Sequence, residues 1–228
     1  MKSYKLIHQL LTLSEKLEQE RPGEDIGLQD FSGFLLNYLK EPHENVLSPD
    51  IRFGKNEPYA QEMAYQVDNN IGRLFVYMSR YAKSYIKKAL DGTLLLTAED
   101  FTCLAILLTH DHLSKSELIS RNLQEKTSGT EVIRRLISFG LAEQWDDESD
   151  KRVKKIAITE KGKQLLYEVF VDMGHVGQIV TGTLTLDEKL TLQYLLQKLE
   201  NFHYRQHELK TVQNKEDLKT VAEQLIAY

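Results

Sequence analysis

The sequence predicts a mainly α-helical protein with one small β-hairpin. Apolar residues recur at three- and four-residue spacing through most of the 228 residues, which is the period of amphipathic helices. All four prolines occur at or before Pro58, so the later helices contain no strong helix breaker. Two short segments, 141–145 and 153–159, flank a polar connector, and this is the pattern of a hairpin.

The composition is that of a folded globular protein, with 41% hydrophobic and 28% charged residues. No segment approaches the roughly 18 to 20 apolar residues of a membrane span, so we expect no membrane partner and a cytoplasmic location. The single cysteine, Cys103, excludes an internal disulfide and a cysteine-cluster zinc site. Because no phosphate loop, nucleophile elbow or paired-carboxylate motif is recognisable, we expect no enzymatic activity and no cofactor.

The centre of the chain carries the signals of two short helices joined by a tight turn. Ser114, with Glu117 three residues later, makes a capping box for a short helix. A turn at 122–124 follows, and the next helix runs from about 126 to 139 before Gly140, a typical C-cap residue. This order is typical of a helix-turn-helix, and the hairpin after it is then a β-wing.

We therefore expect a winged helix-turn-helix with long dimerisation helices, mainly α with a small β-wing. Apolar stripes before and after the wing would leave large exposed faces on a monomer, so we expect a homodimer. Four regions follow: 1–57, an N-terminal helical extension with two amphipathic helices; 58–95, a long dimerisation or linker helix; 96–162, the winged helix-turn-helix; and 163–228, a C-terminal helical dimerisation region.

Four segments resemble the MarR family of bacterial regulators: LTAEDFTCLAIL at 96–107, LSKSEL at 113–118, VIRRLISFGL at 132–141 and DESDKRVKKIAITEKG at 147–162. The resemblance covers about 71–202, and the last segment is the most specific. It implies a transcription regulator that binds double-stranded DNA in a sequence-specific manner. In similar proteins a homodimer places two recognition helices on a pseudo-palindromic operator, and a small-molecule effector relieves repression, so a ligand-responsive repressor is expected.

The resemblance also assigns roles to the basic segment 151–163 and to the second helix of the motif. That helix would enter the major groove, and Arg152, oriented by Asp150, would enter the minor groove. Nearby lysines would contact phosphates. The expected DNA-binding residues are Ser114, Lys126, Thr127, Ser128, Thr130, Arg134, Asp150, Lys151, Arg152, Lys154 and Lys155.

Two residues depart from the family pattern. Gly129 either loosens the recognition helix or lets its backbone approach DNA closely. Glu131 would weaken phosphate binding unless Arg134 or Arg135 neutralises it, with Arg134 the favoured partner. Together with the net charge of -5, they support an alternative, in which the chain is a winged-helix module that binds a protein and no longer reads DNA.

Other candidate residues are weighed against ordinary structural roles. Arg73, Tyr77 and Tyr81 could line an effector cavity, although aromatic residues at helical spacing are more often plain core. His203 and His207 have the spacing of a metal pair, but without a third ligand we expect no metal. Cys103 could sense peroxide, but its apolar helix favours a structural role.

Overall fold

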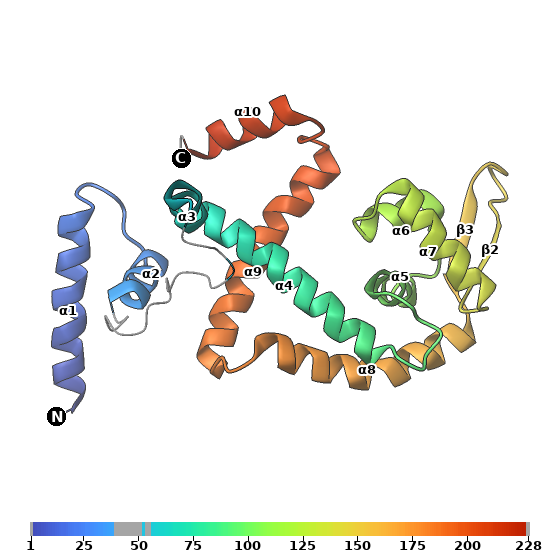
Figure 1. Cartoon of the computed structure of the whole chain (residues 1–228), viewed down its shortest axis with the longest axis horizontal. Coiled ribbons are helices and arrows are strands. Elements are labelled where there is room, and N and C mark those ends of the chain that lie inside the picture. The colour runs from blue at the N-terminus through green and yellow to red at the C-terminus, as the bar shows by residue number, and fades with distance from the viewer. Residues whose placement is uncertain (1, 39–51, 53–55, 227–228) are drawn as a thin grey trace. The chain divides into compact units, whose positions relative to one another are not determined.

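The computed structural model describes residues 2–38, 52 and 56–226 (Figure 1). The helices are α1 (Lys2–Glu20), α2 (Leu28–Tyr38), α3 (Pro58–Tyr65), α4 (Val67–Ala89), α5 (Ala98–Leu108), α6 (Lys115–Arg121), α7 (Lys126–Ser138), α8 (Glu160–Thr181), α9 (Leu186–Leu209) and α10 (Lys215–Ile226). The strands are β1 (Leu113–Ser114), β2 (Ala142–Asp146) and β3 (Lys154–Ile158). This architecture confirms the predicted fold class of a mainly helical protein with a small β-wing.

The chain divides into two compact units, one up to Arg73 and one from Leu74 onward. In the first, α1 and α2 form a helical pair, as their apolar spacing predicts. Leu17 is buried, the rings of Phe34 and Tyr38 stack with centroids 5.8 Å apart, and Lys16 lies over Tyr38. Residues 39–51 and 53–55 of the predicted N-terminal extension lie outside the described residues.

The single long helix expected within 58–95 is wrong, because a break at Gln66 separates α3 from α4. Gln66 has ψ 138°, an extended backbone conformation, and its N–H donates to the carbonyl of Glu62 at the end of α3. The Asn69 side chain donates to the carbonyl of Met63 at 2.9 Å and to the Gln66 side chain at 3.2 Å. Side-chain amides that bond to nearby backbone compete with helix, and here they stabilise the break.

The second unit holds the main core, between α5, α6, α7, α8 and the sheet. Its least exposed side chains are Leu104, Leu107, Leu118, Leu136, Leu141, Ile156 and Leu166. The antiparallel sheet has the order β1-β3-β2, with Leu113 opposite Ile156 and Trp145 opposite Lys155. The strand β1 was not predicted, because two residues are too short to show alternation.

The segment Thr159–Gly162 fastens the end of the hairpin to the turn between α7 and β2. The Thr159 hydroxyl donates to the carbonyl of Gly140 at 2.7 Å and accepts from the N–H of Gly162 at 3.1 Å. A Cβ at position 162 would lie 2.2 Å from the carbonyl oxygen of Leu141, so this close approach requires glycine. Gly140 itself has φ 69°, the left-handed conformation expected of a C-cap glycine.

A buried ion pair joins the start of α5 to α7. Asp100 is almost fully buried, and its carboxylate accepts from Arg135 Nε at 3.1 Å and from Arg135 Nη2. The same carboxylate accepts from the N–H groups of Leu96 at 2.8 Å and Thr97 at 3.1 Å, and the second of these bonds belongs to the capping box of α5. Every strong acceptor position of this buried charge is therefore used in holding α7 against α5.

None of the residues of α9, all of which the structure describes, is buried. Its leucines at 192, 195, 196 and 199 are 39–48% exposed. The part of α4 in the second unit is similar, with Leu74, Phe75 and Met78 exposed. These helices therefore present apolar faces that the described chain leaves uncovered. No helix in the described ranges is long and apolar enough to span a membrane.

Replacing Arg135 with methionine should lower the free energy of unfolding by about 3 kcal/mol, because the buried Asp100 carboxylate loses its charged partner. Urea denaturation at fixed protein concentration measures the change. The matched control is Arg134→Met, since the ion pair of Arg134 with Glu131 leaves the arginine side chain 70% exposed. The control should change the free energy by less than about 0.5 kcal/mol. Equal effects at the two positions would contradict the role given to Asp100.

Candidate DNA-binding interface

The helix-turn-helix consists of α6, the turn 122–125 and α7. Both predicted caps of α6 are present: the N–H of Glu117 donates to the Ser114 hydroxyl, and the Glu117 carboxylate accepts from the N–H of Ser114. In the turn, the Asn122 side chain donates to the carbonyl of Glu99 at 3.2 Å. The turn predicted at 122–124 is thereby confirmed, and it is fastened to α5.

The first turn of α7 exposes the side chains expected to read bases. Lys126, Thr127 and Ser128 are exposed and Thr130 is half-buried. Lys126 adds a positive charge to the partial positive charge of the helix N-terminus, which Glu125 at the N-cap offsets in part. The arrangement suits an approaching anion such as a phosphate.

Gly129 faces α6, and this corrects the expectation that its backbone approaches DNA. The residue is buried, and a Cβ at this position would lie 2.7 Å from Cγ1 of Ile119 and 3.0 Å from its Cγ2. The glycine therefore sets the close packing of α6 against α7. The sequence alone could not assign this contact, because it depends on the angle at which the two helices cross.

The two arginines of α7 have different partners. Arg134 donates to both carboxylate oxygens of Glu131, at 2.9 Å and 2.7 Å, which confirms the favoured neutralising pair. These hydrogen bonds from Arg134 hold the pKa of Glu131 below its usual value. Arg135 is engaged by Asp100 instead. Arg134 is therefore the arginine of α7 whose side chain is exposed on the helix surface.

The wing presents one arginine at its tip. Asp150 Oδ1 accepts from the N–H and from Nε of Arg152, both at 3.0 Å, and Oδ2 accepts from Nη2 at 3.1 Å. The predicted pairing is confirmed, and these bonds hold the pKa of Asp150 below its usual value. The Arg152 side chain is nonetheless 91% exposed. The carboxylate thus fixes the direction of a guanidinium that remains accessible.

The wing lysines predicted to contact phosphate differ in their surroundings. Lys151 is exposed. The ammonium of Lys154 pairs with Asp146 at the end of β2. The ammonium of Lys155 lies 3.1 Å from Asp147 and 3.2 Å from Nε2 of His112, and its side chain is only 25% exposed. The involvement of Asp147 and His112 was not predicted from the sequence.

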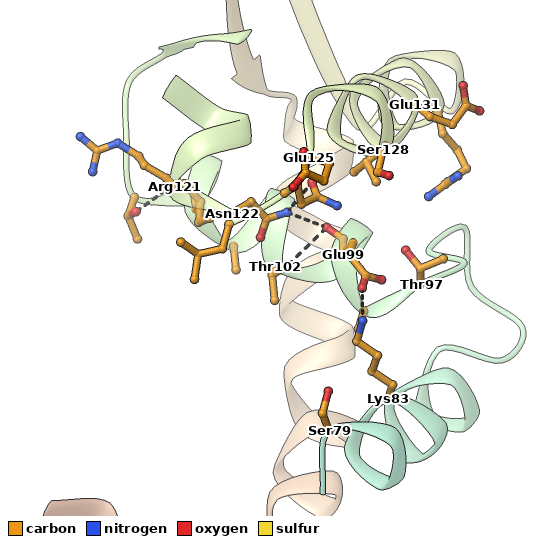
Figure 2. Close-up of a pocket in the computed structure, with 18 residues that line it drawn as sticks. Ser79, Lys83, Thr97, Glu99, Thr102, Arg121, Asn122, Glu125, Ser128 and Glu131 are labelled. Atoms are coloured by element: carbon orange, nitrogen blue, oxygen red, sulfur yellow. Dashed lines mark hydrogen bonds and ion pairs between the residues drawn. The ribbon is translucent and has the colours of Figure 1, made fainter. Parts of the chain in front are cut away.

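A cavity of about 1250 Å³ lies between α4, α5, the turn of the helix-turn-helix and α7 (Figure 2). Lys83 reaches from α4 to the Glu99 carboxylate, with 2.6 Å between Nζ and Oε1. This hydrogen bond lowers the pKa of Glu99. From α7 the lining includes Ser128, Glu131 and Arg135. The cavity therefore adjoins both the recognition helix and a long helix.

Comparison with known proteins gives two kinds of match. The HTH-type transcriptional repressor NicR of Pseudomonas putida is 26% identical over 136 residues, covering 59% of this chain and 85% of NicR. A mutant of MarR from E. coli, solved in complex with operator DNA, has a TM-score of 0.53 at 27% identity and covers 59% of this chain and 98% of its own. No family model matches the chain.

A third similar protein is BpsR of Bordetella bronchiseptica, whose structure addresses the regulation of its DNA binding by 6-hydroxynicotinic acid. It has a TM-score of 0.54 at 22% identity and covers 57% of this chain and 98% of its own. The structural neighbours are thus MarR-family regulators. The chain has the winged-helix fold of the MarR family. The resemblance inferred from four sequence segments is confirmed.

Within this MarR fold, the tyrosines weighed for a ligand, Tyr77 and Tyr81, are not among the residues that line the cavity. Arg73, in the first unit, donates to Asn70 at 2.6 Å, whereas Tyr77 and Tyr81 belong to the second unit. None of the three lines the cavity of Figure 2. The cavity is instead lined by residues of α4, α5, α7 and the turn, which combine polar side chains with a largely apolar exposed surface.

The cysteine and histidine candidates have ordinary surroundings. Cys103 is buried, and this burial raises the pKa of its thiol to about 12, which confirms the structural role over a reactive thiolate. Nε2 of His207 lies 3.2 Å from the Ser120 hydroxyl, and the ring of His203 packs edge-on against Phe202. Within the described ranges, no group of three or more histidine, cysteine or acidic residues surrounds this pair.

The packing of Gly129 gives a test by substitution with alanine. We expect Gly129→Ala to destabilise the protein by about 1–3 kcal/mol, because the added methyl overlaps Ile119 and this outweighs the gain in helix propensity. Gly174→Ala in α8 is the matched control, since a Cβ there would meet no described atom within 4 Å. The control should be neutral or stabilising by up to about 1 kcal/mol. Thermal unfolding compares them, and a stabilised Gly129→Ala would refute the assigned contact.

Proposed function

We propose that the chain is a homodimeric transcription repressor that binds double-stranded DNA through α7 and the wing. Related MarR-type proteins include a named repressor, NicR, and a regulator solved with operator DNA. The observation that carries the proposal is the wing arginine. The Arg152 side chain is 91% exposed yet held by Asp150, and a preordered guanidinium of this kind suits the negative potential of a narrow minor groove.

The recognition helix complements the wing. The exposed hydroxyls of Thr127 and Ser128 can both donate and accept, and a threonine methyl can contact thymine. Lys126 and Arg134 supply positive charge on the same helix, the latter partly offset by Glu131. This set favours moderate base discrimination with a large electrostatic contribution to affinity.

The apolar faces of α4 and α9 support a second copy of the chain as partner. Exposed leucines along α9 would be covered in a homodimer. A two-fold axis would place the two recognition helices about one DNA turn apart, which matches a pseudo-palindromic operator. The regions 58–95 and 163–228 are accordingly assigned to dimerisation, and 1–57 to an extension of unassigned role.

The cavity beside α7 supports regulation by a small molecule. An occupant would contact Arg135 and Glu131 on the recognition helix and Lys83 on α4. A ligand that binds one relative position of these helices more tightly than another shifts the population toward it, and so changes DNA affinity. Because the lining combines polar side chains with a largely apolar exposed surface, it favours a small amphipathic effector.

Fluorescence anisotropy with genomic fragments over a salt series tests DNA binding. We expect affinity to fall linearly with salt on logarithmic axes, and Arg152→Ala to weaken binding by about tenfold. Lys219→Ala is the control, because it also removes one positive charge but lies in α10, paired with Glu216. Absence of DNA binding by the wild-type chain at low salt would contradict this proposal. It would favour the rival function, a module that binds a protein partner, which Glu131 and the net charge of -5 support.

Light scattering tests the dimer. The wild-type chain should show twice the monomer mass of 26.4 kDa. Leu195→Glu should shift the mass toward the monomer, because it places a charge on the exposed apolar face of α9. Leu123→Glu is the control, since this leucine is also exposed but lies in the turn of the helix-turn-helix. A monomeric wild-type chain at micromolar concentration would refute the assembly.

A further inference from the structure

Asp147 is the residue around which the wing loop folds. Its Oδ1 accepts from the N–H of Ser149 at 2.8 Å, from the Ser149 hydroxyl, and from the N–H of Asp150 at 3.3 Å. Its own N–H donates to the carbonyl of Val153 at 3.0 Å, closing the loop on the far side. Asp150 and Arg152 lie on the segment that these bonds shape. The direction of Arg152 therefore depends on the Asp147 carboxylate.

The other oxygen of this carboxylate connects the wing loop to the body of the winged helix. Oδ2 of Asp147 lies 3.1 Å from Nζ of Lys155, which lies 3.2 Å from Nε2 of His112. An ammonium has only donors, so Nε2 accepts in this contact. The His112 ring also packs edge-on against Trp145, opposite Lys155 in the sheet register. The wing is thus braced against the segment just before α6.

Lys154 and Lys155 are adjacent but not equivalent. The Lys154 and Asp146 side chains are 47% and 51% exposed, so water or phosphate can replace that ion pair at little cost. The Lys155 and Asp147 side chains are 25% and 18% exposed. Moving Lys155 onto a DNA phosphate would leave Asp147 with a partly buried and unpaired negative charge, which is unfavourable.

We infer that Lys155 and Asp147 act as a positioning pair for the wing: Lys155 neutralises Asp147 and does not contact phosphate, and Asp147 holds the loop that presents Arg152. This inference rests on the proposed function, because the positioning matters only if Arg152 meets DNA. It reassigns Lys155, which the sequence pattern placed among the phosphate contacts. His112, which contacts Lys155 and packs against Trp145, supports the pair.

Substitution of Asp147 should change DNA affinity in the direction opposite to that expected from its charge alone. Removing a negative charge near DNA should strengthen binding if Asp147 has no positioning role. We expect Asp147→Asn to weaken binding by about tenfold instead, because the amide has one acceptor oxygen and cannot serve both the loop N–H groups and Lys155 as the carboxylate does. Lys155→Met should cause a similar loss, and Lys155→Arg, which keeps a charged donor, should restore most of the affinity.

Double variants with Arg152→Ala, measured by anisotropy over the same salt series, give the decisive test. In the Arg152→Ala background, Asp147→Asn and Lys155→Met should each change affinity by less than about twofold, because the contact they position is already absent. Lys154→Met is the matched control: its loss should persist in that background, and the slope against salt should fall by about 0.9. Hydrogen exchange on the free protein should show faster exchange of the Ser149 and Asp150 amides in Asp147→Asn, with unfolding midpoints confirming that each variant folds.

Two results would overturn the inference while leaving the proposed function intact. One is equal or tighter DNA binding by folded Asp147→Asn. The other is a loss from Lys155→Met that adds fully to that of Arg152→Ala and lowers the salt slope as Lys154→Met does, which would make Lys155 a direct phosphate contact. Absence of DNA binding by the wild-type chain would instead overturn the proposed function, and the inference with it.

Discussion

The ion pair between Asp100 and Arg135 is the constraint on which the DNA-binding unit depends. A carboxylate buried this deeply must be paired and hydrogen-bonded, and its partners come from the cap of α5 and from α7. Satisfying that one charge fixes where α7 lies relative to α5. Since Gly129 then allows α6 to approach α7 closely, the exposed face that carries Lys126, Thr127 and Ser128 has a defined direction.

The wing, like the contact between α5 and α7, is held in place by ion pairs between acidic and basic side chains. Three of its acidic residues are paired with neighbouring basic residues: Asp146 with Lys154, Asp147 with Lys155 and Asp150 with Arg152. These pairs order a loop that has no apolar core of its own. Order in the unbound state lowers the conformational entropy lost on binding, so the acids in the wing can favour DNA binding overall.

Local signals in the sequence predicted many of the helix caps, turns and wing contacts that the structure shows. The capping box at Ser114, the hairpin and the Asp150–Arg152 pair all involve residues a few positions apart. The features that were missed or misread depend on distant partners or very short elements. Asp100 meets Arg135 across 35 positions, Gly129 meets Ile119 from the neighbouring helix, and β1 has only two residues. Periodicity cannot detect such contacts.

We propose that two copies of this unit bind DNA together, with α7 in the major groove and the wing beside it. Hydroxyl-radical footprinting on a DNA fragment selected by the wild-type chain tests this most directly. We expect two symmetric sets of protected nucleotides whose centres are about 10 base pairs, or one helical turn, apart. Each set should be flanked by a protected minor-groove segment. A single asymmetric protected patch, or no protection at concentrations that retard the fragment, would contradict the proposal.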